Sequence, residues 1–234
     1  MLRSIKQLYG NKLGTTDGDL GHVKDFYFSD QNWAIRYLVV DTGTWLPGRL
    51  VLLSPHSLGQ LDQAEKVLRV SLTRKQIENS PSIESHKPVS RQYEEEYYKY
   101  YGWPYYWQGD ALWGSSGFPV PGPPAKHPAT KPATDSVGGK DAHLRSTLAV
   151  DGYQFKTGDR SIGHVCDFMM DAGRWAIDQL VVKTGHRLSG KDMVIPTKDV
   201  DRISYEESTV FATLTGEAAA LFPAPATAET AIVL

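Results

Sequence analysis

The chain has 234 residues, of which 41% are hydrophobic and 22% are charged, and its formal net charge is −2. These values exclude a disordered chain and a strongly basic nucleic-acid-binding protein, and the length suggests two modest domains. The single cysteine, Cys166, excludes a disulfide framework and a zinc site built on cysteines.

Two stretches of the chain repeat each other. "LGHVKDFYFSDQNWAIRYLVVDTG", residues 20–43, matches "IGHVCDFMMDAGRWAIDQLVVKTG", residues 162–185, at a constant offset of 142 residues. The offset holds without a gap over roughly residues 10–73 and 152–215. Because each copy has enough apolar residues for a core of its own, the repeat predicts two like domains.

Each copy carries the signals of short strands. In the first copy they are "HVKDFYF", "WAIRYLVV", "LVLL" and "VLRVSL", separated by turn-forming residues. Successive strands with short connections favour an antiparallel sheet that curls into a small barrel. The last strand alternates most clearly, and its predicted inner face holds Leu68, Val70 and Leu72 and, in the second copy, Val210, Ala212 and Leu214.

The stretch "GHVKDFYF" breaks this alternation. Val23, Asp25 and Tyr27 would share one face of a regular strand, yet Phe26 and Phe28 also require the core. A β-bulge near Asp25 resolves the conflict. We expect Asp25 and its equivalent Asp167 to hold this bulge by bonding to neighbouring backbone groups, in preference to acting as paired general acids or bases.

Two short helices are predicted between the copies. Thr73 lies three residues before Gln76, which is the spacing of a capping box. In "SRQYEEEYYKYYGWPYYWQGDALWG", residues 90–114, tyrosines recur at helical spacing, and Gly102 followed by Pro104 predicts that the helix ends at Tyr101.

The function of this aromatic segment has two interpretations. Its rings could form a platform for a sugar, a base or a partner protein, or they could pack across a barrel and cover apolar surface. We favour packing. Nucleic acid is the poorest ligand, because the run Glu94, Glu95 and Glu96 is offset only by Arg91 and Lys99.

Beyond residue 114 the composition shifts to Pro, Gly, Ser and Thr, which indicates a flexible linker. The resulting division is barrel 1 at 1–83, an aromatic helical segment at 84–114, the linker at 115–143, barrel 2 at 144–223 and a disordered tail at 224–234.

Both copies resemble the PRC-barrel family, the small β-barrel found in the H subunit of photosynthetic reaction centres and at the carboxyl end of a ribosome maturation factor. The family pattern is a glycine, a valine, an aspartate and an apolar residue, followed by an apolar strand and a second strand ending in a polar or proline pair. In this chain it reads Gly21, Val23, Asp25, Phe26, "YLVV" and "VLLSP", and then Gly163, Val165, Asp167, Phe168, "QLVV" and "MVIP".

The resemblance implies a mainly β fold with two small antiparallel PRC-type β-barrels and short helices, joined by the aromatic helical segment and the Pro/Gly-rich linker. It also implies a non-catalytic adaptor or assembly module that binds a protein partner. Such a module could form a homodimer and could lie at the periphery of a membrane complex. The ribosome maturation branch suggests an RNA-associated alternative, and the aromatic segment suggests a small-ligand sensor as another.

No catalytic or metal-binding motif stands out. His22 and His164 each precede an aspartate by three residues, but such residues on a regular strand point to opposite faces, so we expect no metal site. Trp33 and Trp175, at matched positions, are expected to close the core rather than line a pocket. We therefore predict no enzyme activity and no cofactor.

The candidate partner-binding residues are aromatic residues and an arginine that differ between the copies or lie in the aromatic segment: Arg36, Trp45, Tyr97, Tyr101, Trp103 and Trp107. In the second copy Arg36 is replaced by Asp178, Tyr37 by Gln179 and Trp45 by Arg187.

The first ten residues lack the apolar core of a secretory signal, and no window approaches the roughly 18 apolar residues of a membrane-spanning helix. We expect a cytoplasmic protein, in peripheral contact at most with the inner membrane.

Overall fold

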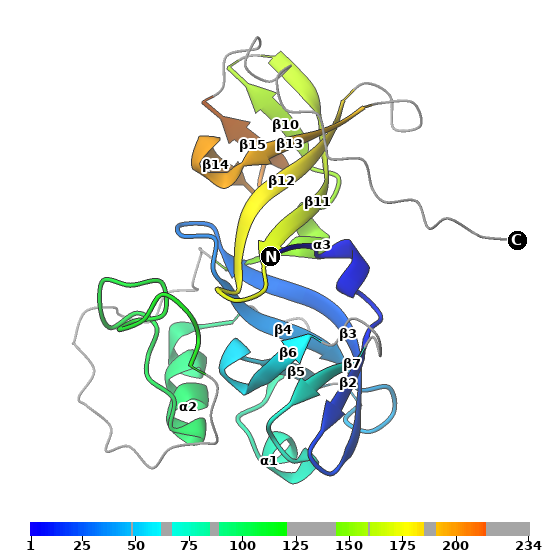
Figure 1. The fold of residues 1–234 in the computed structure, drawn as a ribbon, viewed down its shortest axis with the longest axis vertical. Helices are drawn as coiled ribbons and strands as arrows, with labels where there is room; N and C mark the ends of the chain where they lie inside the picture. Colours follow the sequence, from blue (N-terminus) through cyan, green and yellow to red (C-terminus); the bar gives the residue numbers. More distant parts are fainter. Residues whose placement is uncertain are drawn as a thin grey trace, which may run out of the picture.

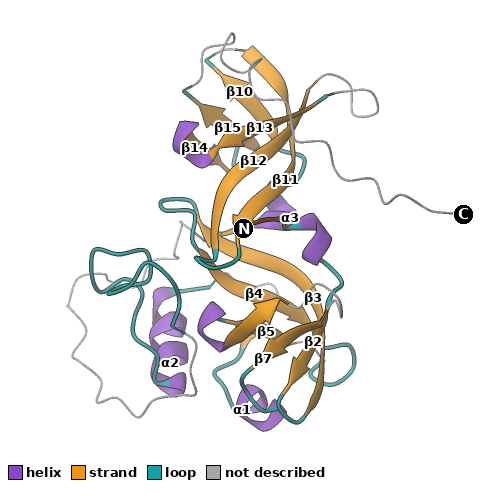
Figure 2. Cartoon of the chain, in the orientation of Figure 1, coloured by secondary structure: helices purple, strands orange, loops and turns teal. Residues whose placement is uncertain are grey.

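Figure 1 shows the computed structural model, which describes residues 1–47, 49–61, 67–84, 89–120, 144–158, 160–184 and 191–213. The chain is mainly β, and its strands curl into half-barrel sheets (Figure 2). Most of the predicted linker, residues 121–143, and the predicted tail lie outside the described residues.

The first sheet, here called the first half, has the strand order β6-β7-β2-β3-β4-β5-β8. Its strands are β2 (Lys12–Thr15), β3 (Gly18–Ser29), β4 (Ile35–Asp41), β5 (Arg49–Leu53), β6 (Leu58–Leu61), β7 (Val67–Val70) and β8 (Ile83–Glu84). The predicted alternation of the last long strand is confirmed, because Leu68, Val70 and Leu72 are buried while Arg69 and Ser71 are exposed.

The second sheet, the second half, has the order β13-β12-β11-β10-β15-β14. Its strands are β10 (Gln154–Thr157), β11 (Arg160–Asp171), β12 (Ala176–Thr184), β13 (Asp192–Pro196), β14 (Val200–Ser204) and β15 (Thr209–Ala212). Val210 and Ala212 are buried as predicted, whereas Leu214 lies outside the described residues. Each sheet also contains one parallel pair that the sequence did not predict. The pair is β2 with β7 in the first sheet and β10 with β15 in the second.

Short helices connect the strands. They are η1 (Lys6–Leu8), η2 (Pro55–Ser57), α1 (Arg74–Glu78), α2 (Arg91–Tyr101), α3 (Thr147–Val150) and η3 (Thr197–Asp199). The capping box at the start of α1 is confirmed: the Gln76 backbone N–H donates to Thr73 Oγ1 over 3.1 Å, and the Thr73 N–H donates to Gln76 Oε1 over 2.8 Å. None of the helices in the described part of the chain has the length and apolar character needed to cross a membrane.

The predicted β-bulge is confirmed in both halves. The register of β3 against β4 shifts between Val23 and Asp25, and that of β11 against β12 shifts between Val165 and Asp167. The shift resolves the conflict of alternation, because Val23, Phe26 and Phe28 all become buried.

The glycines that open this motif are required by close packing. A Cβ atom at Gly21 would overlap the backbone carbonyl of Asp41, and one at Gly163 would overlap the carbonyl of Lys183. Any other residue here would push the two central strands of its sheet apart.

The two halves exchange their first strands. β1 (Leu2–Ser4) pairs antiparallel with β11 of the second half, and β9 (Leu144–Ser146) pairs antiparallel with β3 of the first. Both strands read "LRS", and they are separated by the same 142 residues as the repeat. Each predicted domain range, 1–83 and 144–223, thus contributes its first strand to the sheet of the other.

A second contact joins the halves where the long strands turn. Ala34 and Ala176 form an antiparallel bridge, flanked by hydrogen bonds from Ile35 N–H to Trp175 O over 2.8 Å and from Ile177 N–H to Trp33 O over 2.9 Å. These positions are again equivalent in the repeat, so the contacts follow a pseudo-twofold axis. Both tryptophans adopt positive φ angles, 60° and 51°, which the sequence did not predict.

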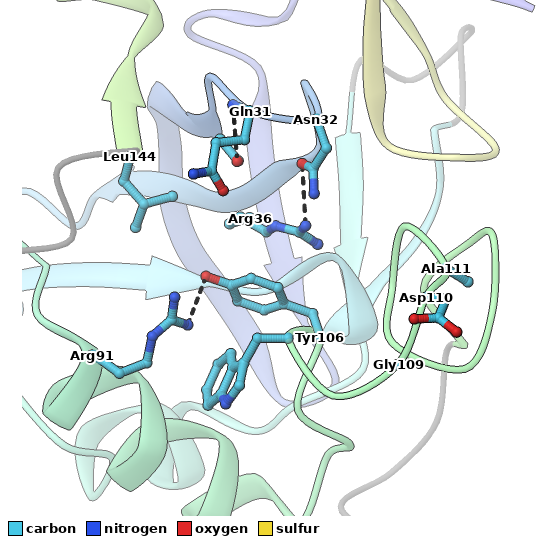
Figure 3. A pocket seen from close by; sticks show the side chains of 11 residues that line it. Gln31, Asn32, Arg36, Arg91, Tyr106, Gly109, Asp110, Ala111 and Leu144 are labelled. Atoms are coloured by element: carbon cyan, nitrogen blue, oxygen red, sulfur yellow. Dashed lines mark hydrogen bonds between the residues drawn. The ribbon is translucent and has the colours of Figure 1, made fainter. Parts of the chain in front are cut away.

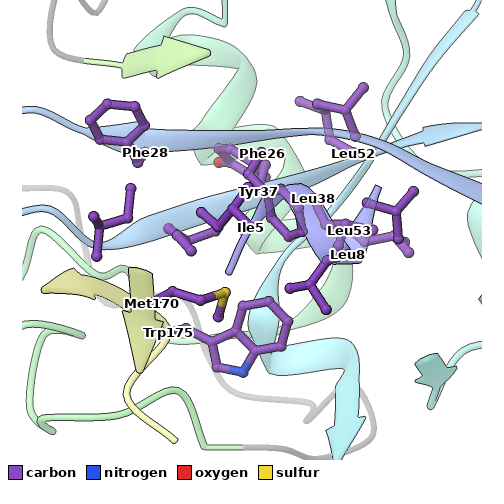
Figure 4. Close-up of a cluster of buried hydrophobic side chains, with 14 of the residues drawn as sticks. Ile5, Leu8, Phe26, Phe28, Tyr37, Leu38, Leu52, Leu53, Met170 and Trp175 are labelled. Atoms are coloured by element: carbon purple, nitrogen blue, oxygen red, sulfur yellow. The ribbon is translucent and has the colours of Figure 1, made fainter. Parts of the chain in front are cut away.

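The core continues through this junction. The rings of Phe28 and Phe168, one from each half, lie 5.8 Å apart between centroids. Met170 and Trp175 of the second half belong to one buried cluster with Ile5 and Phe28, and Figure 4 draws all four side chains. Trp175 is buried, in agreement with the expectation that it closes the core, whereas Trp33 is half-buried and stacks on Phe28.

The two bulge aspartates bind the exchanged strands. Asp25 accepts hydrogen bonds from the Phe26 N–H over 2.7 Å and, across the junction, from the Ser146 and Thr147 hydroxyls. Asp167 accepts from the Phe168 N–H over 2.7 Å and from the Ser4 hydroxyl. The predicted bond from each aspartate to its neighbouring backbone is therefore confirmed.

Candidate functional site

The aromatic segment lies against the outer face of the first half. We call residues 89–120 the strap; it consists of α2 and the loop that follows (Figure 1). Ser90 caps the start of α2 by accepting from the Tyr93 N–H, and Gly102 ends the helix with a φ of 65°. The predicted end at Tyr101 is confirmed.

One face of α2 is anchored to the sheet. The hydroxyl of Tyr97, which is fully buried, donates to Leu52 O and accepts from the Ser54 N–H, both over 3.0 Å. Its ring packs edge-on against those of Tyr37 and Tyr101, with centroids 5.6 and 4.9 Å away. The strap therefore covers the outer face of β4 and β5, which explains why β4 is apolar on both faces.

A buried carboxylate holds the polar side of this interface. Glu94 has no exposed surface, and its Oε1 accepts hydrogen bonds from the hydroxyls of Tyr37 and Tyr106, both over 2.8 Å. Its Oε2 lies 2.9 Å from the Arg91 guanidinium. Burial and the Glu94 charge raise the pKa of both tyrosines, so both remain protonated donors.

Arg36 lies beneath the strap with 1% of its surface exposed. Its guanidinium donates to Leu112 O over 2.9 Å and to Asn32 Oδ1 over 3.3 Å, and it lies 3.7 Å from the centroid of the Tyr106 ring. Its Nε has no hydrogen-bond partner, and no carboxylate of the described residues lies within ion-pair distance of it. Burial lowers the pKa of Arg36, although an arginine stays charged.

A cavity of about 270 Å³ opens beside this arginine. Figure 3 shows that side chains of the β3–β4 turn and of the strap line it from opposite sides. The polar and aromatic groups that face it include Gln31, Asn32, Arg36, Arg91, Tyr106 and Trp107. Asp110, an exposed residue, also lines it. The arrangement places guanidinium groups at the cavity wall, and such donors suit a small anion.

The second half holds a different pair of side chains at the positions equivalent to Asn32 and Arg36. There Arg174 donates two hydrogen bonds of 2.7 Å to Asp178, and this ion pair lies at the surface. In the first half Asn32 takes the place of the arginine and Arg36 takes the place of the carboxylate. A surface ion pair has thus become a buried arginine under the strap.

The predicted partner-binding residues divide into two groups. Arg36, Tyr97, Tyr101 and Trp103 are buried, so in this conformation they hold the strap on the sheet and present no surface to a partner. Partner binding by these four residues stays a prediction, and their burial agrees with the packing interpretation of the segment. Trp45 and Trp107 are half-buried, and Trp45 is covered in part by Arg74, whose guanidinium lies 4.4 Å from the ring centroid.

The two histidines considered in the sequence analysis do not belong to a cluster of metal ligands within the described residues. His22 is exposed and His164 half-buried, and no group of three or more potential ligands occurs within the described ranges. The sequence analysis considered Glu94 only as part of an acidic run that disfavours nucleic acid, and it did not predict the buried role of this residue. Its position between Tyr93 and Tyr97, on the tyrosine face of the helix, was the available signal.

Comparison of the sequence with known protein families finds no family that matches, and comparison with curated proteins finds no similar protein. The PRC-barrel resemblance therefore rests on the motif residues of the two copies.

Proposed function

We propose that the chain is a tandem PRC-barrel-type protein that acts as a non-catalytic adaptor for a protein partner. The motif residues of the two copies support the family, because they occupy the same bulged strand in each half. The exchanged strands support a scaffold role, because they give the two halves a fixed relative orientation.

The observation that carries the adaptor proposal is a partly exposed aromatic cluster of the strap. The rings of Tyr105 and Trp107 stack with centroids 4.8 Å apart, and the Arg91 guanidinium lies 4.3 Å from the Trp107 centroid. Both rings are half-buried, so they are held in place and still reach the surface. Tyrosine, tryptophan and arginine are the residues that most often dominate binding energy at protein interfaces.

A preorganised aromatic cluster loses little side-chain entropy on binding. We propose that it receives an exposed segment of a larger complex, with a membrane-bound complex as the first candidate, as the family resemblance suggests. The second half has Gln179 in place of Tyr37, whose hydroxyl anchors Glu94 of the strap, so the proposed binding surface belongs to the first half.

The test is gradient fractionation of a lysate that contains the protein at its native level, followed by crosslinking mass spectrometry. We expect co-migration with a defined complex and crosslinks from Lys99, which is exposed on α2. A double substitution, Tyr105→Ser with Trp107→Ala, should abolish co-migration, while Tyr205→Ala, at a tyrosine of the second half with 64% exposure, should not.

Equal migration of both variants with the complex would refute the strap as the binding surface. Migration with ribosomal particles that ends at high salt would favour the RNA-associated alternative instead. A lone peak for the unmodified protein would contradict the adaptor function.

A further inference from the structure

The charge of Arg36 is buried beside the cavity without a direct ion pair, although the charge of the nearby Glu94 acts on it. Glu94 contacts Arg91 directly, whereas Arg36 contacts only a backbone carbonyl, an amide oxygen and aromatic faces among the described residues. Removing a cation from water without a paired anion is costly, and the cost is recovered if an anion binds next to it.

We infer that this cavity binds a small organic carboxylate with a planar apolar body. Arg36 lines the cavity and provides a charged guanidinium at its inner wall. A guanidinium and a carboxylate share planar geometry and form paired, charge-assisted hydrogen bonds. The inference does not require the proposed adaptor function, although Arg91 and Trp107 belong both to this cavity and to the proposed binding cluster.

The other walls specify the rest of the ligand. Tyr106 and Trp107 contribute aromatic side chains to the cavity wall. Gln31 and Asn32 of the β3–β4 turn line it from the opposite side (Figure 3). The volume of about 270 Å³ is at the lower end for ligand pockets and limits the site to a small molecule. Asp110 at the exposed edge disfavours a ligand with a second negative charge.

The second half shows that the sheet itself does not need an arginine at this position. The second half keeps its β12 strand in place with an aspartate at the equivalent position, paired with Arg174 at the surface. The fold of a half therefore does not require a buried arginine at this point of the strand.

The experiment titrates the full chain with benzoate and, separately, with benzamide, a neutral molecule of nearly the same shape. The ¹H–¹⁵N NMR signal of the Trp107 indole, identified by Trp107→Phe, reports on the cavity. We expect a saturable shift with benzoate, with a dissociation constant on the order of 1 mM, and at least tenfold weaker binding of benzamide. N-acetylphenylalanine, titrated in parallel, represents a carboxylate at the end of a peptide.

Three variants decide the interpretation. Arg36→Gln should abolish the saturable shift. Arg202→Gln, which removes an exposed arginine of the second half, should leave it unchanged. Asp110→Asn should tighten benzoate binding roughly threefold, because it removes a like charge at the solvent-exposed edge. If Arg36→Gln fails to fold, Asp110→Asn decides: tighter binding supports the inference, and unchanged or weaker binding overturns it.

Equal shifts with benzamide and benzoate, or an Arg36→Gln variant that titrates like the parent, would overturn the carboxylate site. The absence of any saturable shift up to about 20 mM benzoate and N-acetylphenylalanine would do the same. More than tenfold preference for N-acetylphenylalanine would overturn the free small acid as the ligand and assign the site to a peptide carboxylate.

Discussion

At the scale of single residues, the two bulge aspartates accept hydrogen bonds from equivalent groups but differ in their exposure to solvent. Asp25 is 6% exposed and accepts four hydrogen bonds, from Phe26, Ser146, Thr147 and Leu148. Asp167 is half-buried and accepts three, from Ser4, Lys6 and Phe168. Desolvation raises the pKa of Asp25, although its hydrogen bonds to Ser146, Leu148 and others oppose this rise.

Replacing each aspartate by alanine should therefore have unequal effects. Asp25→Ala leaves several buried donors without an acceptor, and we expect it to lower the free energy of unfolding by about 3 kcal/mol. Asp167→Ala should cost about 1 kcal/mol, because water can reach its donors. Urea denaturation measures both values. Equal losses, or a larger loss for Asp167→Ala, would contradict this assignment.

His56 provides a pH-dependent contribution. It is 1% exposed, its ring stacks on Trp103 at 5.7 Å, and its Nδ1 lies 3.1 Å from Val120 O. Burial lowers the pKa of His56, so the folded protein holds it neutral. The unfolded chain binds a proton more readily, so this contribution is complete above pH about 6.5 and is lost as the pH falls.

We expect His56→Gln to reduce the loss of stability between pH 7 and pH 5, where the wild-type slope from this group is at most about 1.4 kcal/mol per pH unit. His22→Gln, at an exposed position, is the control and should leave the slope unchanged. Denaturation at a series of pH values gives the slopes. An unchanged slope for His56→Gln would mean that this histidine does not titrate differently on folding.

At the scale of elements, the strap depends on a few buried hydroxyl groups. Tyr97→Phe removes a hydroxyl that bonds both to Leu52 O and to the Ser54 N–H, and leaves a buried donor and a buried acceptor unpaired. We expect a loss of about 2 kcal/mol in unfolding free energy. Tyr100→Phe removes a hydroxyl that donates to Gln76 O at an exposed position, and should cost less than about 0.5 kcal/mol.

Thermal and urea denaturation compare these two variants directly. If Tyr100→Phe were as damaging as Tyr97→Phe, the strap would not be attached through the buried face of α2 described above.

Local signals in the sequence predicted several elements well. The capping box of α1, the end of α2 at Gly102 and the bulge at Asp25 each depend on residues within a few positions of one another, and each is confirmed. The parallel pairing of β2 with β7 was not predicted, because it joins strands that are distant in sequence and leaves no local pattern.

The site was harder to predict for a physical reason. Arg36 is buried only because the strap crosses β4 at that point, and the path of the strap depends on Glu94 and Tyr106 together. The exchanged strands had a signal, the repeated "LRS", but three residues are too short to stand out without the rest of the repeat.

At the scale of the whole molecule, the two copies form one body around a pseudo-twofold junction. Exchanged strands, the bulge aspartates and the Ala34–Ala176 bridge all meet there, and each contact has its symmetric equivalent. The proposed adaptor function needs this fixed arrangement, because the strap is then displayed at a constant angle to the second half.

The most direct test of this junction is a disulfide between the halves. Ala34 and Ala176 face each other as a non-hydrogen-bonded antiparallel pair, a geometry that brings the side chains close together. We would combine Ala34→Cys and Ala176→Cys with Cys166→Ala, which removes the native thiol, and oxidise the monomer. We expect complete crosslinking within one chain and about 4 kcal/mol of added stability. Free thiols, or crosslinks only between chains, would contradict it.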